Sequence, residues 1–573
     1  MKSIFFTLIF FQIIFAKAFS QESLTIYGFV SDSLTGERIA YATVFIDGTS
    51  IGIAANSHSF YSITTTLRNS LRLKFTHIGY QQKTIVINDT SKNIRLDIRL
   101  VPKSLLYEEV VVEGSRFSQL VKTNSMGVVS MQMSELQHIP SLGGEVDVLK
   151  ALQTSAGVMT GQEFTNGFYV RGGDYSQNLI LLDGVPIYNV SHLFGYFSIF
   201  NNDALQSIEL IKGGMPARYG GRLSSILNVS MKEGNTEKFS AKGGISLMAS
   251  RLSLEGPISD SSRGSFLISG RRTYIDPILN LAAKSPNSDN NFAYYFYDLN
   301  VKANYQFSPE DKVYLSGYFG RDNISFKDTP LTDEPKVRLD LLWGNAAYNL
   351  RYHRIWSSRL FTNAALIYSD YRSKFLFDWK QNVNKKPSVS DWIASLDADY
   401  YMSESSVLQF GASYLHHAFS AFSGIQDIKN TVPVFLASSE IQGYLSLDVT
   451  LNETFRTTAG VQSAYFESGN YFVFDPRFNV RVQLSDKNSI NASYTRMHQF
   501  VHLLSSASLS NPGDILYPST EFLKPEFSDQ LSVGLETLFD GGALGEGRYE
   551  LDADVYYKNM KNYNVCIDAS HTF

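Results

Sequence analysis

Three arginines occupy glycine-rich turns near the middle of the chain. Arg171 stands before Gly172-Gly173, whereas Arg218 and Arg222 enclose Tyr219-Gly220-Gly221. Glycine pairs allow sharp reversals and close backbone packing. A guanidinium buried in such a turn needs a paired carboxylate, and the pair can specify docking more than it stabilises. These arginines therefore favour ionic docking between parts of the protein, and capping of turns inside one domain is the alternative.

The sequence lacks the motifs of catalysis and cofactor binding. It has no GxSxG nucleophile elbow, no Walker loop and no GxGxxG spacing. Adjacent His416 and His417 would point to opposite faces of a strand, which is poor geometry for binding a metal. The single Cys566 excludes an internal disulfide and a structural thiol-metal site. We expect neither an enzyme, nor a cofactor, nor a metal site.

The arginine turns belong to two glycine-rich segments that contain strand-like apolar runs. The first reads FYVRGGDYSQNLILLDGVPIYN from Phe168, and the second reads SIELIKGGMPARYGGRLSSILNVSMKEG from Ser207. Asp183-Gly184 in the first segment is a strong turn signal. Together the two segments predict a small, tightly turned α/β domain.

Composition indicates a protein that lives partly in lipid. Charged residues make up 18% of the 573 residues, below the roughly 25% of soluble domains, and aromatic residues make up 13%. The net charge is −5, and without a basic patch no nucleic-acid partner is expected. Residues 1–20 read as a secretory signal peptide, with Lys2 before an apolar core. No other run of 18 apolar residues exists, so any membrane span must be a β-strand.

The fold class that the sequence predicts is mainly β. Residues 22–100 alternate short strand-like segments with turns such as Thr35-Gly36 and Asp47-Gly48, which predicts a β-sandwich of about seven strands. From about residue 237 to residue 573 the alternation becomes longer. In Tyr295 to Phe307, polar residues such as Asp298 follow one face and apolar residues the other, which suits a transmembrane antiparallel β-barrel.

The glycine-rich segments resemble the plug of TonB-dependent outer-membrane receptors along nearly their full length. The order GFVSDSLTGERIAYATVFIDGT, then SFYSI, then LRLKFTHIGY resembles the carboxypeptidase-regulatory-like domain of Bacteroidetes surface proteins. This domain departs from the family pattern at Asn56-Ser57-His58-Ser59. The resemblance implies a plug at 125–236 and a barrel of 22 strands from 237. With only about 14 candidate strands in the sequence, we expect a fragment that lacks the C-terminal part of the barrel.

The linker at 101–124 contains a candidate TonB box. An extended, β-prone run from Leu106 to Gly114 holds the five central residues Glu108, Glu109, Val110, Val111 and Val112. Such a run can be offered to a partner as an added strand. An ordinary first strand of the plug is the alternative interpretation.

The resemblance also assigns roles inside the plug. In the family, arginines of these turns face carboxylates of the barrel wall, which implies plug–barrel contacts at Arg171, Asp183, Arg218 and Arg222. The aromatic stretch between the two segments would lie at the plug apex, where ligand contact is expected for Tyr188, His192, Phe194 and Tyr196. Packing of these rings against the barrel wall is the alternative.

The function that the resemblance implies is active import across the outer membrane. A scarce siderophore, vitamin, oligosaccharide or peptide would bind outside and enter the periplasm. TonB, with its ExbB/ExbD motor, would supply work from the inner-membrane proton-motive force. Outer-membrane lipid and a surface lipoprotein are further expected partners, with the sandwich and plug on the periplasmic side. The alternative is an adhesion or assembly protein that uses the sandwich for protein binding.

Overall fold

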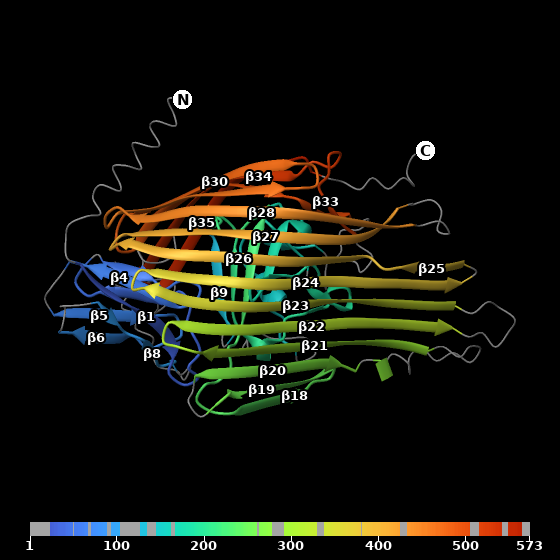
Figure 1. Cartoon of the computed structure of the whole chain (residues 1–573), viewed down its shortest axis with the longest axis horizontal. Coiled ribbons are helices and arrows are strands. Elements are labelled where there is room, and N and C mark those ends of the chain that lie inside the picture. The colour runs from blue at the N-terminus through green and yellow to red at the C-terminus, as the bar shows by residue number, and fades with distance from the viewer. Residues whose placement is uncertain are drawn as a thin grey trace.

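The computed structural model describes residues 23–49, 51–66, 70–88, 93–103, 126–133, 145–161, 167–259, 263–274, 276–277, 291–328, 337–379, 381–423, 432–504, 515–540 and 548–563. Within them the chain forms three parts: an N-terminal sandwich, a plug, and a barrel wall, an open sheet that curves around the plug (Figure 1). The mainly β fold class is thereby confirmed.

The N-terminal domain is a sandwich of two four-stranded sheets, as the spacing of its short strands predicts. One sheet has the order β4-β1-β7, with β8 also pairing with β1, and the other has the order β3-β2-β5-β6. The strands are β1 (Leu24–Asp32), β2 (Thr43–Ile46), β3 (Gly52–Ala54), β4 (Phe60–Thr65), β5 (Leu71–Thr76), β6 (Lys83–Ile87), β7 (Ile94–Arg95) and β8 (Ile98–Leu100). Alternate apolar residues such as Leu71, Leu73 and Phe75 are buried between the sheets.

The segment that departs from the family pattern keeps its turn by other means. The side-chain oxygen of Asn56 accepts hydrogen bonds from the backbone N–H of His58 and of Phe60, each at 2.9 Å. Ser59 adopts a left-handed conformation with φ of 67°. An Asn side chain can stabilise a turn in this way, so the chain enters β4 without a glycine.

The plug is built on a five-stranded mixed sheet of order β13-β12-β17-β16-β9. Its strands are β9 (Val128–Gln132), β12 (Asn178–Leu182), β13 (Val185–Pro186), β16 (Leu205–Ile211) and β17 (Ser225–Met231), and only the β12–β17 pair is parallel. The smaller elements are α4 (Val148–Leu152), β10 (Val158–Thr160), β11 (Phe168–Val170), η2 (Tyr175–Gln177), β14 (Ser191–His192), η3 (Leu193–Gly195), β15 (Phe197–Ser198) and η4 (Asn202–Ala204). The predicted α/β plug is thus present.

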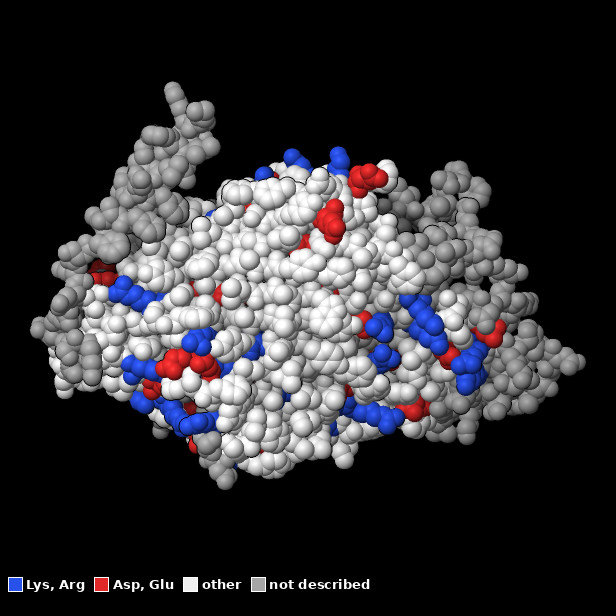
Figure 2. Space-filling view, in the orientation of Figure 1, with Lys and Arg blue, Asp and Glu red and all other residues white. Residues whose placement is uncertain are grey.

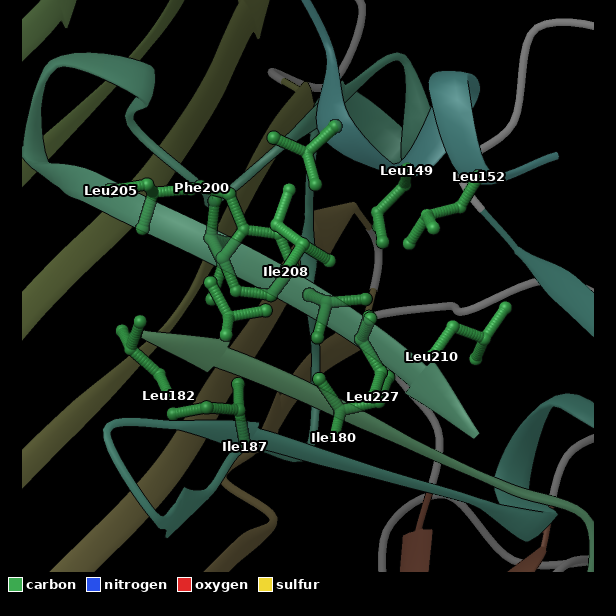
Figure 3. Close-up of a cluster of buried hydrophobic side chains, with 14 of the residues drawn as sticks. Leu149, Leu152, Ile180, Leu182, Ile187, Phe200, Leu205, Ile208, Leu210 and Leu227 are labelled. Atoms are coloured by element: carbon green, nitrogen blue, oxygen red, sulfur yellow. The ribbon is translucent and has the colours of Figure 1, made fainter. Parts of the chain in front are cut away.

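The core of the plug lies between this sheet and the short helix α4. Figure 3 shows Ile208 and Leu210 of β16 together with Leu227 of β17, facing Leu149 and Leu152 of the helix. Asp147 caps the helix by accepting hydrogen bonds from the backbone N–H of residues 149 and 150. This packing gives the glycine-rich turns a rigid base.

The wall is one antiparallel sheet whose strands follow one another in chain order along a single path. Its path runs through β18 (Ser240–Ile245), β19 (Ala249–Pro257), β20 (Gly264–Thr273), β21 (Asn291–Gln306), β22 (Asp311–Asp328), β23 (Val337–Ser357), β24 (Leu360–Trp379), β26 (Ser388–Ser403), β27 (Ser406–Ser423), β28 (Val432–Thr450), β29 (Phe455–Phe466), β30 (Tyr471–Gln483), β31 (Asn488–Gln499), β34 (Glu526–Asp540) and β35 (Arg548–Lys561). Beside this path, β25 (Gln381–Lys385) pairs with β24, and β32 (Val501–Leu504) pairs with β33 (Ile515–Pro518).

The two faces of the wall are reversed relative to a soluble protein. On β21, Asp298, Asn300 and Lys302 are 3%, 1% and 5% exposed, whereas the intervening Leu299 is 42% exposed. Polar side chains therefore face the plug, and apolar ones face outward, as in a barrel that sits in lipid. Figure 2 shows the outer surface over the middle of the strands almost free of charge, with Lys, Arg, Asp and Glu gathered toward the strand ends. None of the helices among the described residues is long and apolar enough to cross a membrane.

Candidate functional site: the contacts between plug and barrel wall

Arg171 joins the plug to β34 and β35 of the wall. Its Nη2 lies 2.9 Å from a carboxylate oxygen of Asp554 on β35, and its Nη1 donates a 3.2 Å hydrogen bond to the hydroxyl of Ser532 on β34. The guanidinium also lies over the ring of Tyr556, at 5.2 Å. Burial lowers the pKa of Arg171, and the charge of Asp554 acts in the opposite direction. The arginine thus stays charged at physiological pH and holds a wall carboxylate.

Two glycines make room for this guanidinium. A Cβ atom at Gly213 would lie 2.4 Å from Nη1 of Arg171, and one at Gly127 would lie 2.6 Å from Nη2. Both distances are far below van der Waals contact. The neighbouring backbone also contributes, because the carbonyl of Lys212 accepts a 3.2 Å hydrogen bond from Gln530 of β34. The Lys212-Gly213-Gly214 motif is therefore shaped around an arginine from the other glycine-rich segment.

Asp183 makes a second contact between plug and wall, and here the plug supplies the negative charge. Its carboxylate lies 2.8 Å from the ammonium of Lys302 on β21. Its backbone carbonyl accepts hydrogen bonds from Asn349 at 2.8 Å and from Arg351 at 2.6 Å, both on β23. Asp183 has a left-handed φ of 50°, which suits the Asp-Gly turn and points this carbonyl at the wall.

Arg218 is hydrogen-bonded to the sandwich domain and lies in the electric field of wall groups. Its Nη1 donates a 3.1 Å hydrogen bond to the hydroxyl of Ser57. Burial acts against the charged form, yet ionisable neighbours, with Asp399 of β26 among them, raise the pKa of Arg218 above its usual range. The expected partner is a wall carboxylate, whereas the hydrogen bond that the structure shows goes to the N-terminal domain, and Asp399 acts on Arg218 through its charge.

Arg222 departs from the expected plug–barrel contact. Its Nη1 donates to the carbonyl of Gly221 at 2.9 Å, and its guanidinium lies 5.9 Å from the centre of the Tyr188 ring. Both of these contacts lie inside the plug. For this arginine the structure favours the alternative role, stabilisation of a turn within its own domain.

His192 is enclosed by two wall aspartates. Its Nε2 lies 2.8 Å from Asp298 of β21 and its Nδ1 lies 2.5 Å from Asp322 of β22, and the residue is only 1% exposed. Ionised carboxylates accept but do not donate, so both ring nitrogens must carry a proton. Burial lowers the pKa of His192, but the two carboxylates outweigh it and raise the pKa to about 9. The ring also stacks on Phe296 at 4.0 Å.

The surrounding groups balance this charge. Arg271 of β20 donates to Asp298 at 2.6 Å and also to the carbonyl of Ser198 in the plug at 2.8 Å. The hydroxyls of Tyr318 and Tyr294 donate to Asp298 and Asp322, at 2.7 and 2.9 Å. Two cations therefore face two carboxylates, and a neutral, hydrogen-bonded cluster of this kind can be buried at a tolerable cost.

The plug apex presents one exposed aromatic residue of the four predicted ligand contacts. Phe194 is 43% exposed and lies 5.3 Å from Trp343 of β23. Leu193 and Phe194 both have left-handed φ angles, of 49° and 54°. Non-glycine residues rarely adopt this conformation, which is often found at functional sites.

The remaining predicted ligand contacts are engaged in other interactions. The hydroxyl of Tyr188 donates to Asp391 of β26. Tyr196 packs under the ammonium of Lys150, which lies 4.5 Å from its ring centre. His192 has no polar atom left for a ligand, since both of its nitrogens bind wall carboxylates.

The sequence matches three family descriptions in the order of the three structural parts. These are a CarboxypepD_reg-like domain over 26–112, a TonB-dependent Receptor Plug Domain over 126–225, and a TonB dependent receptor-like beta-barrel over 267–571. The barrel match alone covers more than half of the chain. The chain belongs to the TonB-dependent receptor family. Members of this family are outer-membrane receptors and transporters rather than enzymes.

Solved structures of TonB-dependent receptors share this fold. A variant of the ferric enterobactin receptor of Pseudomonas aeruginosa has a TM-score of 0.54 and 15% identity, over 78% of this chain and 72% of that one. A siderophore receptor of Acinetobacter baumannii gives 0.54 and 14%, over 75% of each chain. An outer membrane transporter of Escherichia coli gives 0.53 and 12%, over 72% and 67%. The sequence matches no curated protein.

Sequence reasoning missed several wall residues of this receptor's plug interface. Asp322, Arg271 and Lys302 became visible only in the folded structure, although Lys302 and Asp298 stood on the predicted polar face of β21. The five TonB-box-like residues 108–112 lie outside the described residues. Among the described residues no cluster of His, Cys, Asp and Glu could hold a metal ion.

Proposed function

We propose that this receptor imports a scarce ligand across the outer membrane by displacement of its plug. The observation that carries the proposal is the set of charged contacts that hold the plug in the lumen, above all the Arg171–Asp554 pair and the His192 cluster. Ionic and hydrogen-bonded contacts can be exchanged for water as the plug moves, which limits the cost of displacing it. The ligand classes that we propose are a siderophore chelate, a vitamin, an oligosaccharide or a peptide.

The short connections of the barrel indicate which end faces the periplasm. Strand pairs β21–β22, β23–β24 and β26–β27 are joined through 307–310, 358–359 and 404–405. At the opposite end the connections are longer, such as 274–290 and 329–336. Outer-membrane barrels have short periplasmic turns and longer outer loops. The sandwich lies at the short-turn end (Figure 1), which supports a periplasmic position for it after removal of a signal peptide at 1–20.

The energy for displacement has to come from another membrane. The outer membrane maintains no energised gradient, so an active importer there needs a mechanical partner. The run from Leu106 to Gly114 joins the sandwich to the plug and has the β-prone character that strand addition requires. We assign it to TonB, which would pull on the plug with work from the ExbB/ExbD motor.

At the outer end, the proposed ligand contact is Phe194. Its exposure, its strained backbone and its position beside Trp343 support this role. His192 and Tyr188 are instead assigned to plug–wall contacts, because their polar atoms are already bound to Asp322 and Asp391.

Strand addition can be tested with a matched pair of substitutions. Proline at position 111 removes a backbone N–H and cannot join a strand freely, whereas alanine keeps the N–H. The full chain in detergent should retain the soluble domain of TonB with wild-type Val111 and with Val111→Ala, and should lose it with Val111→Pro. Equal binding by all three proteins would contradict the assignment of this segment to TonB.

Uptake in living cells separates the importer from the adhesion or assembly protein. Energised cells that express the chain are given ferric enterobactin, cyanocobalamin, a maltooligosaccharide and a short peptide as probes. The proposal predicts that one of them accumulates, and that a protonophore or Val111→Pro abolishes the accumulation. Uptake that persists in Val111→Pro cells would contradict TonB-driven import.

A further inference from the structure

The sandwich domain packs against the inner rim of the barrel wall through an aromatic cluster. Phe60 of β4 stacks on Phe361 of β24 with ring centres 5.1 Å apart, and meets Tyr401 of β26 edge-on at 5.7 Å. Phe29 and Ile355 complete the cluster, and all five side chains are buried. Aromatic rings that bury themselves between two domains stabilise a defined docked geometry. The sandwich therefore packs directly against the wall and is not joined to it only through a linker.

Polar contacts surround this cluster, as at the rim of a protein–protein interface. The hydroxyl of Ser62 donates to the carbonyl of Ser358 at 2.6 Å. Arg359, in the same wall turn, donates to the hydroxyls of Ser23 at 2.6 Å and of Thr25 at 3.3 Å. The turn between β23 and β24 therefore contacts the sandwich along its first strand and along β4.

The same domain also holds the plug. The carboxylate of Glu37 accepts hydrogen bonds from the backbone N–H of Glu233 at 2.8 Å and of Gly234 at 3.3 Å, where the chain leaves the plug for the barrel. On the plug sheet, Glu209 of β16 accepts a 3.3 Å hydrogen bond from the Tyr41 hydroxyl. These contacts involve backbone and side chains of the plug's last segment and of its central sheet.

Three consecutive residues reach the plug and the wall together. Asn56 donates to Asp399 of β26 at 2.8 Å, while Ser57 accepts from Arg218 of the plug. The ring of His58 lies 4.4 Å from that of His353 on β23. This is the segment in which the domain departs from the pattern of its family, so the departure coincides with the docking contacts.

We propose that the sandwich domain is a clamp that ties plug and barrel wall together at the short-turn end, so that undocking of the sandwich precedes movement of the plug. The domain bridges the two parts through contacts that a plug leaving the lumen would have to break, at Glu233, Glu209 and Arg218. Its anchorage on the wall is independent of the plug, through the aromatic cluster around Phe361. This proposal does not depend on TonB being the source of the force that moves the plug.

A cysteine in the plug can report this clamp. The side chain of Ala217 faces the wall, where its Cβ lies 3.0 Å from the position of a Cβ at Gly460 on β29. Ala217→Cys, in a Cys566→Ser background, reacts with a charged thiol reagent only when plug and wall part. The reaction rate in the full chain therefore measures plug movement without any ligand or TonB.

The wall side of the clamp is loosened by Phe361→Ala. We expect this substitution to speed labelling of Ala217→Cys about fivefold, from the loss of the ring contacts. Trp356→Ala is the matched control, since Trp356 is an exposed aromatic on the neighbouring strand β23 and lies outside the cluster. Equal rates in Phe361→Ala and Trp356→Ala would overturn the clamp.

The plug side is loosened by Gly36→Ala. A Cβ at Gly36 would lie 2.0 Å from the hydroxyl of Thr236, which would have to turn away and give up its hydrogen bond to the Thr35 carbonyl. Gly48→Ala is the control with the same backbone strain, since the φ angles are 76° and 75° but a Cβ at Gly48 meets nothing within 4 Å. Faster labelling is expected in Gly36→Ala alone.

Tightening the clamp should have the opposite effect, which keeps the test valid if a loosened variant misfolds. Ser62→Cys and Ser358→Cys are joined by a short bifunctional thiol reagent, and the excess is removed before labelling. We expect labelling of Ala217→Cys to slow about fivefold, because the cross-link prevents the undocking of the sandwich that precedes the opening. An unchanged rate after cross-linking, with the link verified by mass spectrometry, would overturn the proposal.

Discussion

At the scale of single residues, the plug interface retains buried charges where apolar side chains would pack more cheaply. Arg171 is held by Asp554 and Ser532, and Gly213 and Gly127 leave space for its guanidinium. Such an arrangement fixes one orientation of the plug, since the fork of an arginine has few alternative partners.

Removal of the arginine should weaken plug docking. Arg171→Ala is expected to lower the free energy of plug unfolding in urea by about 1–3 kcal/mol, because it leaves wall groups without a partner. The transition can be followed by tryptophan fluorescence, since Trp343 is buried beside the plug carbonyl of Ser191. Arg171→Lys is the charge-matched control and should recover part of the loss. An unchanged midpoint in Arg171→Ala would contradict this role.

The His192 cluster should make plug stability depend on pH. The pKa of His192 is raised from 6.5 to about 9, so its stabilising charge is fully present below pH 6.5 and is lost as the pH rises through 9. Thermal unfolding of the plug should therefore shift to lower temperature between pH 6.5 and pH 9. His192→Gln should flatten this dependence. If the unfolding temperature of His192→Gln depends on pH as strongly as that of the wild type, groups other than His192 cause the effect.

At the scale of elements, the two-residue alternation of the wall strands determines which side chains meet lipid. Leu299 lies near the middle of β21 on the outer face, whereas Phe307 follows the end of the strand at the short-turn side. A lysine costs about 2–4 kcal/mol at the membrane midplane and much less near its surface.

This depth dependence gives a paired prediction. Leu299→Lys should sharply reduce the amount of folded protein in the outer membrane, because the ammonium would be desolvated in hydrocarbon. Phe307→Lys should leave it close to wild type. The folded fraction is measured by the heat-modifiable shift on gels. Equal tolerance of both substitutions would argue against the assigned lipid-facing surface.

The elements also show what sequence can and cannot predict. The strands of the sandwich and the faces of β21 follow from local patterns of period two, and the plug turns follow from their glycines. The partners across the interface do not, because His192 and Asp298 are 106 residues apart and Arg218 and Ser57 are 161 apart. Nothing in a local pattern specifies such pairs, so the roles of His192 and Arg222 emerged only in the folded chain.

At the scale of the whole molecule, plug, wall and sandwich form one locked arrangement. Arg171 ties the plug to β35, whereas Asp183 and His192 both tie it to β21. At the short-turn end, the sandwich contacts the plug through Glu37 and the wall through Phe60. Import through such a barrel requires these contacts to open, and the segment between sandwich and plug is the place where a pull would act on both.

Locking the plug to the wall tests this account most directly. Ala217→Cys and Gly460→Cys place two Cβ atoms 3.0 Å apart in a Cys566→Ser background. The Cβ atoms of a disulfide lie about 3.5–4.5 Å apart, so the bond forms once the two segments separate by roughly 0.5–1 Å. Uptake of ferric enterobactin, cyanocobalamin, the maltooligosaccharide and the peptide is measured in energised cells before and after reduction of this bond. The account predicts that one probe accumulates only once the disulfide is reduced. Accumulation at the same rate with the disulfide intact would contradict it.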